Sequence, residues 1–159
     1  MKWEEIGKQP CSIARTLSVL GDRWTMLILR NAFMGMRRFD DFQENLGVTR
    51  HLLSERLKRL VEHEILVKTP YTDRQERFEY RLTEKGLDLY PILLTMTNWA
   101  DKWMDEGLGQ PLIYLHQNCG HTFKPTMTCS ECGEEIHARQ VKPQLTQAYF
   151  TYLEQQKKA

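Results

Sequence analysis

Apolar residues recur at helical spacing through the first part of the chain and predict a series of amphipathic helices. Residues 11–20, 24–33 and 37–47 each repeat apolar side chains three or four positions apart, the interval that gathers them on one face of an α-helix. Gly21 is expected to end the first of these helices, and Asp22 to cap the second. The segment 24–33 is apolar almost all round, so it is expected to lie at the centre of a core.

A tight turn at Gly47 and Val48 leads into the helix around which the chain is organised. Thr49 is a typical N-cap, and the helix after it has an apolar stripe on one face. The stripe consists of Leu53, Leu57, Leu60 and Val61, and the opposite face carries Arg50, His51, Ser54, Glu55, Lys58 and Arg59. Phe42 and Leu46 are expected to pack against this stripe, which gives a helix-turn-helix whose second helix suits a DNA major groove. The alternative is an ordinary solvated surface helix.

Two strands joined by a charged tip are expected directly after this helix pair. ILVKTPY is rich in β-branched residues, and FEYRLT alternates apolar with polar positions, while TDRQER between them is prone to turns. The hairpin is therefore predicted to be a wing, with Arg74 and Arg77 placed for phosphates or the minor groove. A plain surface hairpin is the alternative, because it would also tolerate two arginines.

A longer helix is predicted after Thr83, with Gly86 as an interior weakness and Pro91 as a kink. Its later part has a broad apolar face made of Leu93, Met96, Trp99, Ala100 and Trp103. A chain of this size offers little to cover so large a face, so we expect it to form the interface of a homodimer. The alternative is that the helix packs back onto its own domain.

The composition excludes several classes of protein. With 41% hydrophobic and 27% charged residues the chain fits a globular protein, and no apolar run approaches the roughly 18 residues that cross a bilayer. The amino end is not a signal peptide, so a cytoplasmic location and no membrane partner are expected. The net charge of +1 neither supports nor opposes nucleic-acid binding. The sequence shows no paired acid and base, no phosphate-binding loop and no open metal site. We therefore expect neither an enzyme nor an organic cofactor.

Three of the four cysteines lie in a short stretch near the carboxyl end, in two similar units. His116-Gln-Asn-Cys119-Gly and Cys129-Ser-Glu-Cys132-Gly each give a ligand, two spacers, a cysteine and a glycine, which is typical of a zinc knuckle. The four residues predict a structural, tetrahedral Zn²⁺ site on a β-hairpin, with His121 as a rival to His116. Ordinary thiols, or a site that has lost its metal, are the alternatives.

The expected fold class is mainly α with a small β-hairpin (α+β): a winged helix-turn-helix with a cysteine-rich tail. Residues 1–106 form the DNA-binding and dimerisation domain, and 107–111 form a linker. Residues 112–143 form a zinc-ribbon-like extension, and 144–159 form a last helix or tail.

Several segments together resemble the HxlR-type (MarR-like) winged-helix transcriptional regulators of bacteria. The pattern Cys-x2-Ala-x5-Leu-Gly-x-Arg-Trp-x3-Ile-Leu-Arg begins at Cys11, and RRFDDFQENLG, the helix after Thr49 and RFEYRLTEKG follow in the family's order. The resemblance covers roughly residues 8 to 106 and implies a homodimer that binds double-stranded operator DNA. Such families carry Gly before the first wing strand, where this chain has His63-Glu64-Ile65-Leu66.

The resemblance also gives Cys11 a role, since it matches a cysteine with which some members sense oxidants or electrophiles. A thiolate at a helix start near Arg15 is chemically plausible, and an inert core thiol is the alternative. The function expected is a DNA-binding transcriptional regulator that acts as a repressor. The alternative is a protein-binding adaptor, or a thiol- or zinc-dependent stress protein without sequence-specific DNA binding. The residues expected at the DNA are Thr49, Arg50, His51, Ser54, Lys58, Arg74 and Arg77.

Overall fold

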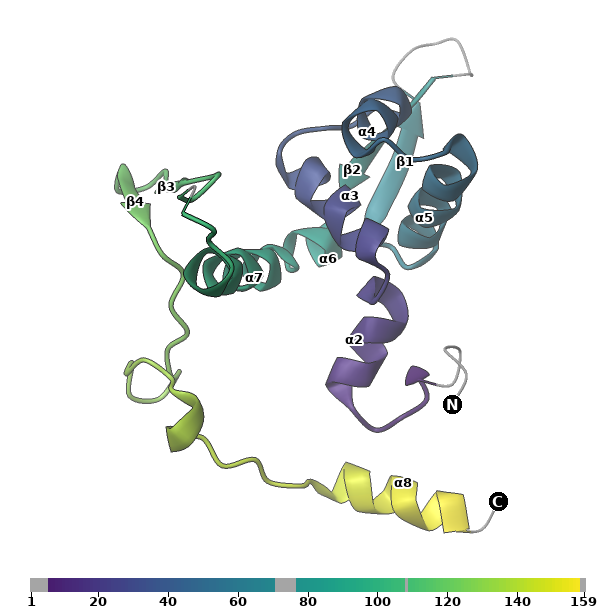
Figure 1. Ribbon diagram of the computed structural model, residues 1–159. Coiled ribbons are helices and arrows are strands. Elements are labelled where there is room, and N and C mark those ends of the chain that lie inside the picture. The colour runs from purple at the N-terminus through teal and green to yellow at the C-terminus, as the bar shows by residue number, and fades with distance from the viewer. Residues whose placement is uncertain (1–5, 71–76, 108, 158–159) are drawn as a thin grey trace. The chain divides into compact units, whose positions relative to one another are not determined.

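The computed structural model describes residues 6–70, 77–107 and 109–157 (Figure 1). The chain divides into two compact units, Met1–Tyr90 and Pro91–Ala159. The first unit holds the helices α2 (Ser12–Leu20), α3 (Arg23–Phe33), α4 (Phe39–Leu46), α5 (Arg50–Glu62) and α6 (Glu84–Leu87), and the strands β1 (Leu66–Pro70) and β2 (Phe78–Leu82). The order of helices followed by a β-hairpin confirms the winged helix-turn-helix expected from the sequence.

The core of the first unit lies where α3, α4 and α5 meet the β1–β2 hairpin (Figure 1). The largest side chains with almost no exposed surface come from all of these elements: Ile28, Leu29, Phe42, Leu53, Leu57, Leu60 and Leu66. The stripe expected on α5 is confirmed for its three leucines. The apolar positions of the helix expected over residues 11–20 are not all buried in α2: Leu20 is buried, while Ile13 and Leu17 are exposed.

Local capping explains where the helices begin. The Asp22 carboxylate accepts hydrogen bonds from the backbone N–H groups of Trp24 (2.9 Å) and Thr25 (3.2 Å) at the start of α3. Thr49 accepts one from the N–H of Leu52 at 3.3 Å. Gly47 ends α4 with φ 62°, a left-handed conformation that glycine adopts without steric cost. The capping roles predicted for Asp22 and Thr49 are therefore confirmed.

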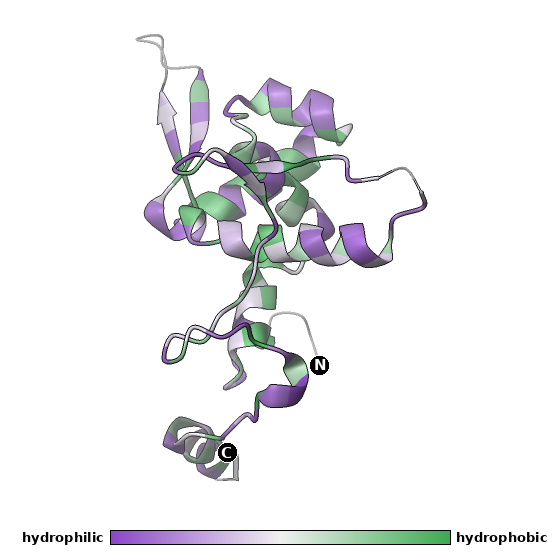
Figure 2. Cartoon of the chain, turned by 90° about the vertical axis from the view of Figure 1, so that its left-hand side faces the viewer, coloured by the Kyte–Doolittle hydropathy of each residue, from purple (hydrophilic) through white to green (hydrophobic). Residues whose placement is uncertain are grey.

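The wing is an antiparallel hairpin in which Lys68 lies opposite Tyr80. Apolar and polar residues alternate along β2, as the colours of the hairpin in Figure 2 show. The backbone just before α4 pairs with the hairpin at one point, because Arg38 forms an isolated bridge with Glu79 and the N–H of Tyr80 donates to the Arg37 carbonyl at 2.8 Å. The helix predicted from residue 37 therefore begins only at Phe39, since the two arginines before it pair with the wing.

The segment after the wing corrects two expectations. Gly86 is not a weakness in a long helix: it is buried, and a Cβ on it would lie 2.2 Å from the carbonyl oxygen of Ile65. The close approach of backbone to backbone requires glycine here. Pro91 does not kink a helix either, because α6 ends at Leu87 and a new helix, α7 (Tyr90–Trp103), starts beside the proline.

The second unit contains most of α7 and the tail. Its other elements are β3 (Tyr114–His116), β4 (His121–Phe123), the short 3₁₀ helix η1 (Ala138–Gln140) and α8 (Gln147–Lys157), of which β3 and β4 pair antiparallel. Leu94 of α7 is buried, but from Asp101 to Gln155 no residue whose burial the structure describes is buried. None of the helices in the described part of the chain is long and apolar enough to cross a membrane.

Candidate nucleic-acid interface

A groove in the first unit runs between the starts of α4 and α5 and the wing. It is lined by residues from four elements: Phe39, Arg50, His51, Ser54, Lys68, Phe78 and Tyr80. Three of these, Arg50, His51 and Ser54, were expected at the DNA from their positions on one helix face. The tertiary structure adds Lys68 on β1, whose Nζ lies 4.0 Å from the centre of the Phe78 ring. Sequence reasoning missed Lys68 because only the packing of the hairpin against the helices brings it next to α5.

Arg50 is held at the mouth of this groove by weak contacts. Its guanidinium donates to Asp40 and Gln43 at 3.2 Å each, and it lies 4.8 Å from the centre of the Phe39 ring. The side chains of Arg50 and Asp40 are 70% and 84% exposed. An ion pair this exposed contributes about 0–1 kcal/mol, so a phosphate or a guanine edge can replace Asp40 at little cost.

The other residues expected at the DNA lie around this groove or outside the described residues. Thr49 is used as the N-cap of α5, with its hydroxyl turned to the helix backbone. Lys58 lies one turn after Ser54 and pairs with Glu62 at 3.7 Å, on an exposed surface. Arg77 is exposed just before β2, and Arg74 lies outside the described residues.

An ion pair fixes α5 against the start of α3. Arg56 contacts the Asp22 carboxylate through Nε at 3.0 Å and through a terminal nitrogen at 3.2 Å, with side chains only 17% and 27% exposed. On the next turn, Arg59 donates to the Ser18 carbonyl in α2. The same Asp22 that caps α3 therefore also sets the direction of α5, and with it the orientation of the exposed face.

Asp22 is partly buried, which by itself disfavours its charged form. The hydrogen bond from Arg56 and those from the backbone of Trp24 and Thr25 outweigh that burial, so the pKa of Asp22 lies below its ordinary value. Burial by itself lowers the pKa of Arg56, but the hydrogen bond and the charge of the Asp22 carboxylate outweigh it, so the pKa of Arg56 is raised. Both partners therefore stay charged at neutral pH.

Cys11 is the N-cap residue of α2, and its side chain is exposed in the single chain. Its side chain makes no capping hydrogen bond. The guanidinium of Arg15, expected near the thiol, donates to the Ser12 hydroxyl at 3.1 Å.

The expected zinc ligands form two pairs in the tail. His116 Nδ1 lies 3.3 Å from the Cys119 sulfur, at the turn between β3 and β4. In the other turn, backbone N–H groups of Cys132 and Glu131, together with the Cys132 thiol, lower the pKa of the Cys129 thiol. Within the described residues no three His, Cys, Asp or Glu side chains are grouped closely enough to hold a metal ion. The structure thus forms each pair and does not bring the two pairs together.

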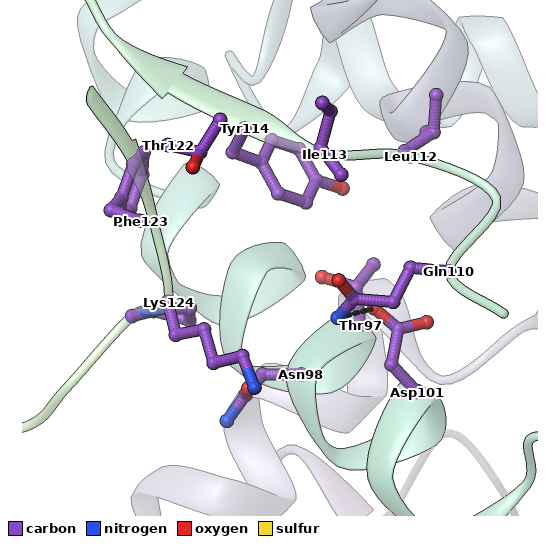
Figure 3. A pocket seen from close by; sticks show the side chains of 11 residues that line it. Thr97, Asn98, Asp101, Gln110, Leu112, Ile113, Tyr114, Thr122, Phe123 and Lys124 are labelled. Atoms are coloured by element: carbon purple, nitrogen blue, oxygen red, sulfur yellow. Dashed lines mark hydrogen bonds between the residues drawn. The ribbon is translucent and has the colours of Figure 1, made fainter. Parts of the chain in front are cut away.

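His121 pairs with His116 across the hairpin but has no contact with Cys119 among those given by the structure. The hairpin faces α7 across a hollow of about 200 Å³ (Figure 3). Tyr114 and Phe123 lie on one side of it and Thr97, Asn98 and Asp101 on the other, where Gln110 donates to Asp101 at 3.2 Å. This volume is below the roughly 300 Å³ at which ligand pockets begin, so we assign it no ligand.

The chain matches the HxlR-like helix-turn-helix family over residues 19–108. It is 44% identical over 133 residues to the uncharacterized HTH-type transcriptional regulator Rv3095 of Mycobacterium tuberculosis, an alignment covering 84% of each chain. The matched region contains the helix pair, the wing and α7.

Solved structures are similar in fold. The crystal structure of PA1607, a candidate transcription factor, superposes with a TM-score of 0.78 at 30% identity and covers 90% of this chain and 99% of its own. That alignment must extend well beyond residue 108, so PA1607 shares part of the tail. The redox regulator HypR in its reduced form covers 60% of this chain and 95% of its own, with a TM-score of 0.56 at 29% identity. Taken with the helix pair and wing, these likenesses show that the chain belongs to the HxlR-like family of winged helix-turn-helix transcriptional regulators.

Proposed function

We propose that this protein is a homodimeric repressor that binds operator DNA through α5 and the wing and responds to oxidants or electrophiles through Cys11. The observation that carries the DNA-binding part is the groove of Arg50, His51, Ser54 and Lys68. The hydrogen-bond donors of these side chains suit the acceptor atoms of base edges and phosphates. Arg56 holds α5 in place through its ion pair with Asp22.

Within this proposal, Arg50, His51 and Ser54 approach bases in the major groove. Lys58, Lys68 and Arg77 hold phosphates, and Arg74, which lies outside the described residues, has the same role. Arg50 exchanges Asp40 for a base or phosphate when DNA binds, which costs little because that ion pair is exposed.

Fluorescence anisotropy with the protein's own upstream DNA and a scrambled duplex tests this directly. Arg50→Ala is expected to weaken binding to the true site by about 1–3 kcal/mol, and to weaken binding to the scrambled duplex much less. Lys68→Ala should weaken binding to both duplexes equally. It should also lower the salt dependence of the binding constant by about the amount expected for one phosphate contact. Glu44→Ala, an exposed change on α4 outside the groove, is the matched control. Wild-type protein that binds both duplexes equally at all salt concentrations would contradict the regulator.

The homodimer is supported by apolar faces that the chain leaves exposed. On α7, Met96, Trp99 and Trp103 are 51%, 59% and 67% exposed, and on α2 Ile13 is 72% exposed. Large apolar surfaces of this kind are typical of interfaces, and buried tryptophans often dominate their energetics. A second copy covering these faces presents two α5 helices to half-sites about one DNA turn apart.

Sedimentation equilibrium tests the dimer. Trp99→Glu is expected to shift the protein to monomer and to weaken operator binding, since one α5 contacts only one half-site. Glu106→Lys, an exposed charge change just after α7, is the control and should leave the dimer intact. A wild-type protein that sediments as a monomer at micromolar concentration would exclude this part of the proposal.

The thiol response is supported by the exposure of Cys11 and by the similarity to a redox regulator. Oxidation or alkylation there alters the start of α2, whose Ser18 carbonyl accepts a hydrogen bond from Arg59 of α5. A quinone, which alkylates a single thiol, is expected to lower the operator affinity of the wild type and to leave that of Cys11→Ser unchanged. A response that persists in Cys11→Ser but disappears in Cys132→Ser would transfer sensing to the tail.

The repressor role is tested with a reporter driven by the protein's own upstream region. Deleting the protein should raise reporter output, and Arg50→Ala should reproduce the deletion. A fall in output on deletion would instead indicate an activator.

A further inference from the structure

The tail contains two turns of the same construction, and the winged helix-turn-helix does not account for either. In the first, the N–H of Gly120 donates to the His116 carbonyl at 2.8 Å, and in the second the N–H of Gly133 donates to the Cys129 carbonyl at 2.9 Å. The two glycines have φ values of 71° and 75°. The first turn closes the β3–β4 hairpin, and the second is closed by a bridge between Thr128 and Glu135. Two copies of one turn geometry in so short a segment indicate a shared purpose.

Each turn already holds its donor atoms together. His116 Nδ1 and the Cys119 sulfur are 3.3 Å apart. Two ligands of one tetrahedral Zn²⁺, with Zn–N of about 2.0–2.1 Å and Zn–S of about 2.3 Å, lie roughly 3.6 Å apart. In the second turn, the backbone N–H groups of Glu131 and Cys132 point at the Cys129 sulfur. Both pairs therefore have the local shape in which a metal ion is bound.

The described part of the tail has strand pairing and ring contacts but no buried core. From Asp101 to Gln155 no described side chain is buried, and apolar residues such as Ile113, Leu115, Met127 and Ile136 are exposed. All four cysteines of the chain are free thiols in the structure. A segment this small without a core generally needs a metal or disulfides to fix its structure.

We propose that His116, Cys119, Cys129 and Cys132 bind one Zn²⁺ in a closed, tetrahedral Cys₃His site that joins the two turns. Because the two pairs are separate in the structure, the metal must draw the second turn onto the first. Three thiolates and an imidazole favour zinc over magnesium or calcium, which take oxygen ligands. With four protein ligands no position remains for substrate, so the site is structural. His116 is preferred to His121 because it alone is paired with Cys119.

The metal content of the full chain tests the site. Untagged protein purified from zinc-supplemented cells under reducing conditions is expected to contain about one Zn²⁺ per chain by mass spectrometry. Cys132→Ser and His116→Ala should each lose most of it. His121→Ala and His137→Ala are matched histidine controls and should keep it. Co²⁺ added to the metal-free protein should give the intense visible absorption of a tetrahedral thiolate site, and this absorption should weaken in Cys132→Ser.

Limited proteolysis separates loss of the site from a failure to fold. Chelation of the wild type is expected to expose residues 112–143 to cleavage while residues 6–90 remain protected, and added Zn²⁺ should restore protection. Wild-type protein without metal under these conditions would overturn the proposal. Loss of zinc in His121→Ala but not in His116→Ala would overturn the ligand set. None of these measurements depends on operator binding. The zinc site and the proposed DNA-binding function can therefore be tested, and can fail, independently of each other.

Discussion

The two units of this chain keep their structure by different means. In the first, helices and a hairpin bury Phe42, Leu53 and Leu57 completely. In the second, Leu94 is buried, while Trp99 and Trp103 are exposed and the tail buries nothing that the structure describes. The first unit thus carries its own core, whereas the second presents surfaces suited to a second copy and ligands suited to a metal. Apolar burial therefore stabilises the first unit, whereas binding of a second copy and of a metal ion is expected to stabilise the second.

Deleting a core aromatic side chain is expected to have the largest effect. Phe42→Ala should lower the free energy of unfolding of the first unit by about 3–5 kcal/mol, because it leaves a cavity among packed side chains. Phe123→Ala, an aromatic deletion at an exposed tail position, should cost less than about 1 kcal/mol. Urea unfolding followed by circular dichroism measures both. Equal losses would show that the tail has a core of its own.

A methyl group at Gly86 is expected to have the next largest effect. Gly86→Ala places a Cβ against the Ile65 carbonyl and should cost about 1–3 kcal/mol in global stability. Gly133→Ala meets no atom within 4 Å, so only backbone strain at its positive φ, about 1 kcal/mol, disturbs its turn. Thermal unfolding of the first unit should respond to the first change and not to the second.

Breaking the Asp22–Arg56 pair tests how α5 is held. Asp22→Asn keeps a capping oxygen but removes the charge, and should cost about 1–2 kcal/mol at neutral pH. Because the folded-state pKa of Asp22 is lowered, its contribution is complete above its ordinary value of 3.8 and is lost as pH falls through the lower folded value. The stability difference between wild type and Asp22→Asn should therefore shrink only in acid. The control is Asp40→Asn, which removes an exposed pair and should change stability by less than about 0.5 kcal/mol.

The smallest effect is expected at Glu64, where φ is 58°. A non-glycine residue in the left-handed region is strained. Glu64→Gly should raise the free energy of unfolding by up to about 1 kcal/mol. Glu62→Gly, two residues earlier at the end of α5, should lower it by about 0.5–1 kcal/mol. A destabilising Glu64→Gly would mean that the glutamate makes a contact that offsets its strain.

The sequence alone determined the features that depend on neighbours along the chain. Helical periodicity gave α5 its buried leucines, and hydrogen-bonding side chains placed the caps at Asp22 and Thr49. Alternation predicted β2, and the spacing of His116 and Cys119 predicted a donor pair that the structure forms. These features depend on interactions between residues a few positions apart in the chain, so the local sequence determines them.

Only the tertiary structure decided the features that join distant segments. It buried Asn31, whose amide donates to Asn45 at 2.8 Å, and it paired Asp22 with Arg56 across 34 positions of sequence. It showed that Gly86 must be glycine because the Ile65 carbonyl lies too close for a Cβ, and it placed Lys68 beside α5. Such contacts depend on how whole elements pack, and no local pattern encodes which side chains then meet. In the described part of the tail no side chain is buried, so the ligands are known from the sequence, and the metal that we propose would bring its two turns together.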